Sequence, residues 1–125
     1  MNYSSLVLAF IGDSVFELKI REHFLSMGIS KVKNLQKETS KYASAKGHKV
    51  IVDYFIDNNI LSEEELNIYK RGRNAKVNQR RKNFDSVSYH ASTGFEALIG
   101  ALYLNDESER INELIEIIVK DINVL

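Results

Sequence analysis

The sequence predicts an all-α protein of one domain, and three observations support this prediction. The 125 residues include no proline and only six glycines, so little interrupts a helix. The apolar residues, 44% of the chain, recur at helical spacing. The β-branched residues do not alternate with polar ones, as they would in strands. Because a chain of this length and apolar content can bury a core, we expect a single domain over residues 1–125.

The pattern predicts five main helices. The first has apolar residues at helical spacing up to Phe24, and Gly28 is a plausible stop signal. In the second, Gly47 weakens the middle and marks a possible break. The predicted helices cover residues 5–26, 31–57, 62 to between 74 and 76, 89–104, and 107–122.

The third predicted helix has the clearest start signal. Ser62 and Glu65 have the spacing of a capping box, with Leu61 and Leu66 placed as a hydrophobic staple. The fourth begins after a polar loop that ends near residue 85, and Asn105 or Asp106 is expected to cap the fifth. The short connections between these helices leave no room for a domain boundary.

Composition excludes several classes of protein. The absence of cysteine excludes disulfides, cysteine-bound zinc and thiol catalysis. No stretch approaches the roughly 20 apolar residues that cross a bilayer, and acids follow the apolar run at residues 6–11 at once, unlike in a signal peptide. His23, His48 and His90 lack metal-ligand spacing, and we interpret each as a surface or capping histidine. We therefore expect a soluble cytoplasmic protein without a membrane partner.

The charges are segregated along the chain although the formal net charge is zero. Residues 70–82 contain seven bases and no acid. Residues 83–125 contain eight acids and only Arg110 and Lys120 as bases. This segregation favours a polyanionic partner on one face. A solvated loop beside an acidic helix is the alternative that charge alone leaves open.

Two acids lie where acids are energetically costly. Asp13 and Glu96 each stand in an apolar helical segment, where a carboxylate needs a cation, hydrogen bonds or a metal. Gly12 and Gly100 would let the two helices approach closely and bring the carboxylates together. Clustered carboxylates without a nearby base attract a divalent cation. The alternative is that both are surface acids at the ends of apolar stripes.

The basic segment is suited to binding phosphates. Single-stranded nucleic acid calls for aromatic side chains between the bases, whereas here Tyr69 and Phe84 only flank the run. Recognition of a duplex through its shape and phosphates is therefore favoured. The residues predicted to bind RNA are Arg71, Arg73, Asn74, Lys76, Arg80 and Arg81.

Both acidic segments resemble the ribonuclease III family. Residues 10–15, Phe-Ile-Gly-Asp-Ser-Val, resemble the signature of its catalytic domains, which ends in Phe-Leu-Gly-Asp-Ala-Val. Residues 95–104 resemble the second catalytic segment, and the likeness extends over nearly the whole chain. The nearest branch is mini-ribonuclease III, which has no double-stranded RNA-binding domain, and the residues after Tyr103 are too few to form one.

The resemblance implies a fold of about five main helices, a homodimer, and an Mg²⁺-dependent endoribonuclease that hydrolyses double-stranded RNA. Asp13 and Glu96 would be the catalytic residues and hold Mg²⁺, which Mn²⁺ can replace, and Glu17 would be a further ligand. The implied substrate is the precursor of large-subunit ribosomal RNA in the bacterial cytoplasm. The resemblance also leaves room for a ribosomal protein as a helper.

The chain departs from the family at three acidic positions. Leu6, Ala9 and Thr93 stand where full-length ribonuclease III carries acids. These departures favour one Mg²⁺ with water ligands over two metals, and they leave the roles of Glu17, Thr93 and His90 open. They also keep a second hypothesis, a protein that binds structured RNA during ribosome assembly without cutting it. A helical adaptor would explain the fold but not the basic run.

Overall fold

The computed structural model describes residues 2–76 and 85–124, and within them it contains six α-helices and no strand. The all-α prediction is confirmed for these residues. None of the described helices is both long enough and apolar enough to cross a membrane. The helices are α1 (Ser5–Ser26), α2 (Val32–Ala43), α3 (Ala45–Asp57), α4 (Glu63–Arg73), α5 (Ser86–Leu104) and α6 (Ser108–Asp121).

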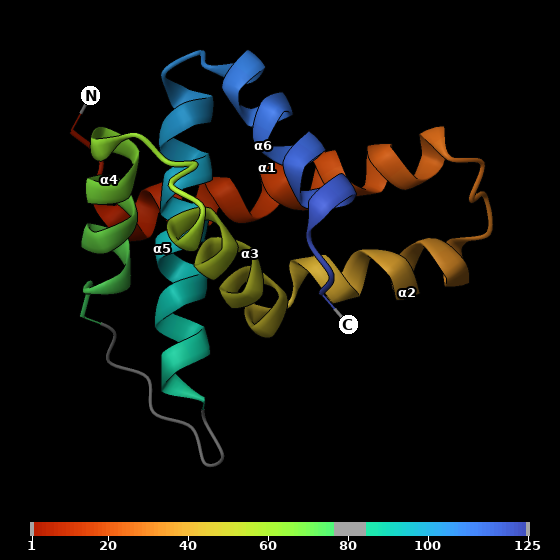
Figure 1. The fold of residues 1–125 in the computed structure, drawn as a ribbon, viewed down its shortest axis with the longest axis horizontal. Coiled ribbons are helices and arrows are strands. Elements are labelled where there is room, and N and C mark those ends of the chain that lie inside the picture. Colours follow the sequence, from red (N-terminus) through yellow and green to blue (C-terminus); the bar gives the residue numbers. More distant parts are fainter. Residues whose placement is uncertain (1, 77–84, 125) are drawn as a thin grey trace.

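Helix α5 stands at the centre of the molecule (Figure 1). Helix α1 crosses it, α4 and α3 pack along it, and α2 runs back beside α1. Helix α6 follows α5 and lays one apolar face on the same core. This central position explains why α5 is apolar on nearly all sides, whereas α6 is amphipathic. The largest fully buried apolar side chains are Phe16, Ile20, Ile51, Phe55, Phe95, Leu98, Ile99, Ile111, Leu114 and Ile118.

The second predicted helix is in fact two helices that meet at Ser44. This residue is extended (φ −75°, ψ 160°), and its hydroxyl caps α3 by accepting a hydrogen bond of 3.0 Å from the Gly47 amide. A Cβ atom at Gly47 would overlap the carbonyl oxygen of Lys41 at the end of α2. The prediction of one helix over residues 31–57 was therefore wrong: the break is at the serine, and the glycine lets the two helices meet closely.

The predicted capping box of the third helix is confirmed at the start of α4. The Glu65 amide donates to the Ser62 hydroxyl at 3.1 Å, and the Ser62 amide donates to the Glu65 carboxylate at 2.9 Å. Helix α5 begins earlier than predicted because Asp85 caps it, accepting from the Ser88 amide at 3.1 Å.

The expected cap of the last helix was wrong. Glu107 holds the N-cap position of α6 and makes no side-chain capping hydrogen bond. Asp106 instead takes a positive φ of 58° in the turn between α5 and α6. Aspartate tolerates this left-handed conformation better than most residues, so it serves the turn rather than the helix.

Candidate functional site

Two glycines fix the crossing of α1 and α5. A Cβ atom at Gly12 would overlap the carbonyl oxygen of Glu96 and lie 2.7 Å from the amide nitrogen of Gly100. A Cβ atom at Gly100 would overlap the carbonyl oxygen of Leu8. The two backbones therefore touch, as the small residues had suggested. Asp13 on α1 and Glu96 on α5 both lie at this contact, so the two acids are brought close together.

The carboxyl groups of Asp13 and Glu96 are in contact. Burial raises the pKa of Glu96 to about 9, and the Asp13 carboxyl adds to the rise through a side-chain hydrogen bond and through its charge. Within the described residues, no ion pair joins either acid to a lysine or an arginine. With its pKa near 9, the Glu96 carboxyl carries a proton at neutral pH unless a cation is bound.

Glu17 is the third residue predicted to bind the metal, and its side chain has another partner. One of its carboxylate oxygens lies 2.6 Å from the Arg21 guanidinium, on a partly exposed face of α1. In residues 2–76 and 85–124, no three His, Asp or Glu side chains are grouped so that they could hold a metal. The structure thus brings together Asp13 and Glu96, and the role of Glu17 as a ligand stays a prediction.

The positions where the family carries further acids do not add a ligand here. The Thr93 hydroxyl donates to the Tyr89 carbonyl oxygen at 3.1 Å, so its proton is used within α5. Ala9 is buried and Leu6 is exposed, and neither has a polar side-chain atom. Within the described residues, the acidic side chains that the crossing of α1 and α5 brings together are those of Asp13 and Glu96.

This pair suits Mg²⁺. A magnesium ion prefers oxygen ligands, keeps several waters and is usually held by only one or two carboxylates together with substrate phosphates. Two touching carboxyl groups with no described base paired to them provide such a set. Binding would release the proton of Glu96, because a ligating carboxylate must be ionised.

His48 lies in the core near this site, a position that the sequence analysis did not predict. Its side chain is only 1% exposed, its Nδ1 shares a hydrogen bond of 2.7 Å with the Ser92 hydroxyl, and its ring packs against Phe16 and Phe95. Burial lowers its pKa to about 4, against the opposing effect of the Asp13 charge. The interpretation of this residue as a surface or capping histidine was wrong.

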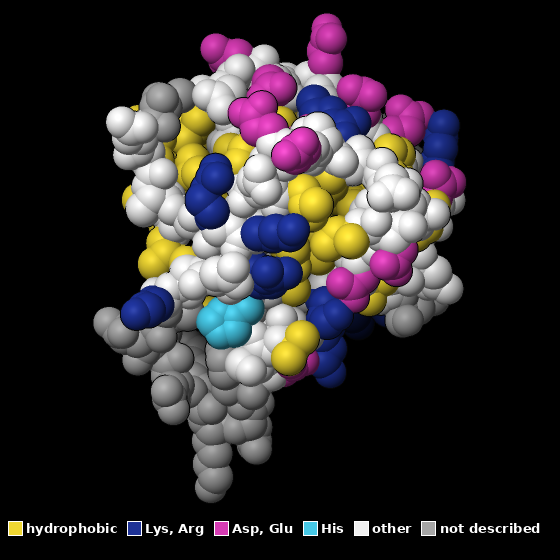
Figure 2. Space-filling view, turned by 60° about the vertical axis from the view of Figure 1, so that its left-hand side comes forward, with side chains coloured by type: hydrophobic (Ala, Val, Ile, Leu, Met, Phe, Trp, Pro, Cys, Tyr) yellow, Lys and Arg dark blue, Asp and Glu magenta, His cyan; other side chains and the backbone are white. Residues whose placement is uncertain are grey.

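The predicted RNA-binding residues lie near the end of α4. A hollow of about 630 Å³ separates this end from the start of α1, and Arg71, Asn74 and Lys76 line it together with Lys70. Figure 2 shows Lys and Arg side chains gathered on this face and acids concentrated along its upper edge. The segregation of charge along the sequence is therefore also present on the surface.

Arg73 is held differently from its neighbours. Its guanidinium lies 5.6 Å from the centre of the Tyr69 ring and donates to the Asn74 side-chain oxygen at 3.2 Å. None of the ion pairs between described side chains uses Arg71, Arg73 or Lys76. Their positive charges are thus not neutralised by acids of the described chain. Arg80 and Arg81 lie outside the described residues.

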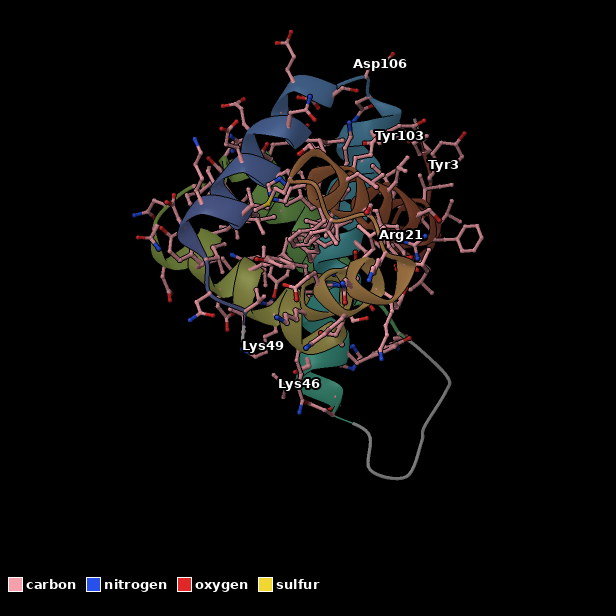
Figure 3. The ribbon with its side chains drawn as sticks, turned by 90° about the vertical axis from the view of Figure 1, so that its right-hand side faces the viewer. Tyr3, Arg21, Lys46, Lys49, Tyr103 and Asp106 are labelled. Atoms are coloured by element: carbon pink, nitrogen blue, oxygen red, sulfur yellow. The ribbon has the colours of Figure 1, made fainter. Side chains whose placement is uncertain are left out.

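An apolar surface follows the first turns of α1. Phe10 is 77% exposed, whereas Phe16 and Phe95 are buried in the core, a distinction that the sequence could not make. Tyr3 and Tyr103 lie on the same side of the molecule (Figure 3). The exposed apolar side chains there, here called the Phe10 surface, are Tyr3, Leu6, Val7, Phe10 and Tyr103.

Known proteins resemble this chain over most of its length. The family model described as "Ribonuclease III domain" matches residues 6–107. The chain is 39% identical to the Mini-ribonuclease 3 of Streptococcus pneumoniae, over 90% of this chain and 88% of that one. It is 44% identical to the Mini-ribonuclease 3 of a Thermoanaerobacter species, over 96% and 83% of the two chains.

A solved structure supports the same conclusion. The crystal structure of a protein from Fusobacterium nucleatum superposes with a TM-score of 0.81 at 37% identity, covering 95% of this chain and 93% of that one. Sequence and fold thus agree over most of both proteins. The chain belongs to the ribonuclease III family, in its mini-ribonuclease III branch.

Proposed function

We propose that this member of the ribonuclease III family is a divalent-metal-dependent endonuclease that cleaves double-stranded RNA. Its proposed substrate is the precursor of large-subunit ribosomal RNA in the bacterial cytoplasm. The observation that carries the proposal is the contact between the Asp13 and Glu96 carboxyl groups. Two acids pressed together without a paired base reduce stability, and a cation and a phosphate would make use of them.

Asp13 and Glu96 are the residues that would hold Mg²⁺, or Mn²⁺ in its place. When bound, the ion supplies activation of a water molecule and stabilisation of charge on a phosphate. Glu96 would give up its proton when the ion binds, and the Asp13 carboxyl would supply a second oxygen ligand. The Gly12–Gly100 contact brings together the two helix backbones that carry these carboxyl groups. Glu17 stays our candidate for a further or indirect ligand.

The basic residues would position the duplex. Arg71, Arg73, Asn74 and Lys76 provide several N–H donors on one face, which suits contacts to phosphate oxygens. Because Arg73 is held against Tyr69, its guanidinium is already ordered and loses little freedom on binding. Such contacts recognise the shape of an RNA duplex without reading its sequence.

A cleavage assay tests the activity. The protein would be incubated with a duplex RNA and with a single strand of the same sequence, each in Mg²⁺ and then in EDTA. We expect discrete fragments from the duplex in Mg²⁺ alone. Binding of the duplex without fragments at any Mg²⁺ or Mn²⁺ concentration would instead support the non-cutting RNA-binding protein.

The dependence of binding on salt tests the basic surface. Replacing Arg71 and Arg73 with alanine should weaken duplex binding, and each lost phosphate contact should reduce the slope of log affinity against log salt by roughly one. Replacing Lys120, an exposed base paired with Glu116 on α6, is the control and should leave the slope unchanged. An unaltered slope in the double variant would remove these arginines from the interface.

We also propose that the protein acts as a homodimer formed through the Phe10 surface. The exposed apolar side chains of the Phe10 surface favour burial against a second copy. A two-fold axis would present one Asp13–Glu96 pair to each strand of the duplex. Phe10→Ser should shift the protein towards a monomer in sedimentation, whereas Leu18→Ser, an exposed leucine farther along α1, should not. A monomer of the unchanged protein that still makes paired cuts would contradict the dimer.

A further inference from the structure

The exposed side of α1 carries a row of charged residues that begins at Asp13. Glu17 and Arg21 follow Asp13 at intervals of four residues, and each interval turns by only about 40° around the helix axis. Asp13 and Arg21 are exposed, and Glu17 is partly exposed. Arg21 therefore lies on the same side of α1 as the proposed metal site, about 12 Å farther along the helix.

Lys19 is the other base among the lysines and arginines of α1, and it faces a different way. It lines a hollow of about 510 Å³ between α1 and α6. Figure 3 shows Arg21 in the half of the molecule that holds Tyr3 and Tyr103, with α6 in the other half. Of these two bases, Arg21 is thus the one that shares the side of the acid pair.

The guanidinium of Arg21 is held in place but not enclosed. Its Nη2 atom lies 2.6 Å from Oε2 of Glu17, and the side chains of Arg21 and Glu17 are 51% and 38% exposed. A guanidinium presents five N–H donors in a planar fork, so donors remain for an anion besides Glu17. Because the ion pair already orders the side chain, binding a second anion costs less conformational freedom.

Along α1, the acid pair lies between two groups of bases. The hollow lined by Arg71, Asn74 and Lys76 adjoins residues 4–6 at the start of the helix. Arg21 lies on the other side, eight residues after Asp13. It is not part of the Phe10 surface, which ends one turn before Asp13. An RNA strand held at the acid pair can therefore meet a base on either side of it.

We propose that Arg21 binds a phosphate of the RNA strand whose cleaved bond lies at the Asp13–Glu96 pair. Because a strand of B-form duplex carries one phosphate per roughly 3.4 Å of axis, this phosphate lies about three to five nucleotides from the cleaved bond. The guanidinium donors that Glu17 does not use bind its oxygens. This inference rests on the proposed function, and it adds a subsite that aligns the RNA over the acids.

Duplex binding in EDTA tests the contact separately from cleavage. Arg21→Ala should weaken binding of a duplex RNA about tenfold, the lower end for a charge-assisted hydrogen bond, and reduce the slope of log affinity against log salt by roughly one per lost contact. Arg21→Lys keeps the charge and should recover the slope. Lys19→Ala removes a base from the other side of α1 and should change neither quantity. Equal affinity and slope in Arg21→Ala and the unchanged protein overturn the inference, while the proposed function stands if the unchanged protein still cuts the duplex.

Arg21→Ala also leaves the Glu17 carboxylate without its ion-pair partner, and this charge by itself repels RNA. Glu17→Gln and the double variant Glu17→Gln/Arg21→Ala separate the two effects. If Arg21 contacts a phosphate, the double variant should bind the duplex about tenfold more weakly than Glu17→Gln. Equal binding by these two variants would assign the loss to repulsion and contradict the contact.

Neutral phosphate analogues locate the contact on the RNA. A methylphosphonate, which carries no charge, would be placed at one position at a time on either side of the cleaved bond. In the unchanged protein and in Lys19→Ala, we expect one position, about three to five nucleotides from the bond, at which the analogue lowers kcat/KM about tenfold. In Arg21→Ala the same analogue should have no further effect, because the partner of that phosphate is already gone. The absence of such a position, or an equal loss in Arg21→Ala, overturns the inference.

Discussion

Two glutamates of this protein occupy opposite environments. Glu65, at the start of α4, is buried and meets the Arg110 guanidinium of α6 with both carboxylate oxygens, at 2.8 and 2.9 Å. The hydrogen bond from Arg110 holds the pKa of Glu65 below its ordinary value. Glu96, at the crossing of α1 and α5, meets another acid, and its pKa rises to about 9. The same side chain is thus stabilised as an anion in one place and destabilised in the other.

The comparison separates an acid that supports the fold from an acid that is available for chemistry. Arg110 also donates to the Ile60 carbonyl oxygen at 2.7 Å, so the Glu65 pair joins α6 to the turn before α4. Glu96 has no such cation within the described chain. A protein keeps an unfavourable carboxyl contact only where something outside the chain makes use of it. Perturbation of the Glu65–Arg110 pair should therefore reduce stability, and perturbation of the Asp13–Glu96 pair should reduce activity.

The largest expected effect is on cleavage. Asp13→Asn keeps the size of the side chain and removes the charge, so cleavage should fall at least about a hundredfold, the scale of losing one preorganised charge-stabilising group. Fragment yield from duplex RNA in Mg²⁺ measures this loss, with circular dichroism to confirm that the helices are intact. A variant that cuts at nearly the unchanged rate would place Asp13 outside the site.

Removal of the cation at the supporting pair should reduce stability instead. Arg110→Leu leaves the Glu65 carboxylate without its main partner and should lower the free energy of unfolding by about 1–3 kcal/mol, since the pair is mostly buried. Because the pKa of Glu65 is lowered in the folded state, its contribution is present above the unfolded-state pKa and is lost as the pH falls through the folded-state value. Urea unfolding at pH 7 and pH 3 measures both. A deficit in Arg110→Leu that persists undiminished at pH 3 would refute the electrostatic explanation.

Neutralising Glu96 should increase the free energy of unfolding instead of lowering it. Its pKa rises from 4.5 to about 9 on folding, so the unchanged protein is penalised increasingly as the pH rises between these values. Glu96→Gln removes the penalty and should add about 1–2 kcal/mol of stability at pH 8 without metal, with cleavage lost. The gain should vanish near pH 4. Equal stabilities of the two proteins at pH 8 would show that the carboxyl groups are not in contact in solution.

The smallest expected effect is that of the metal on folding. At a free Mg²⁺ concentration equal to its dissociation constant, the unchanged protein should gain only about 0.4 kcal/mol, rising to about 1.4 kcal/mol at ten times and about 2.7 kcal/mol at a hundred times that concentration. Arg110→Leu should gain as much, because its acidic pair is intact, and Glu96→Gln should gain little. Thermal denaturation at fixed protein concentration follows this. A gain in Glu96→Gln as large as in the unchanged protein would point to a different metal site.

The sequence predicted much of the fold because its strongest signals are local. Helix starts depend on nearby residues, and the Ser62–Glu65 capping box was accordingly correct. The second predicted helix divides at Ser44, three residues before the possible break predicted at Gly47, and the exact position was not predicted because an extended serine followed by a helix leaves the apolar pattern almost continuous. The prediction that Gly12 and Gly100 bring two helices together succeeded because close contact requires the absence of a side chain.

Pairings between distant segments were predicted less well. Arg110 meets Glu65 across 45 positions, and nothing near either residue indicates the other. The exposure of individual side chains was equally hard to predict from the sequence. Phe10 and Phe16 lie on the same apolar helix, and only Phe16 is covered by α5. For His48 a signal was present: it precedes Ile51, Val52 and Phe55 at the spacing of one buried helical stripe. A histidine in such a stripe is better interpreted as a core residue than as a surface one.

The contact between Gly12 and Gly100 also has a consequence for redesign of the protein. Side chains can rotate to suit a new ion, but a distance set by two touching backbones cannot be adjusted in that way. A single methyl group at either position would part the helix axes, and the gap between the acids would widen with them. In the proposed metal site, the spacing of the two carboxylates would thus depend on two glycines that carry no ligand atom themselves.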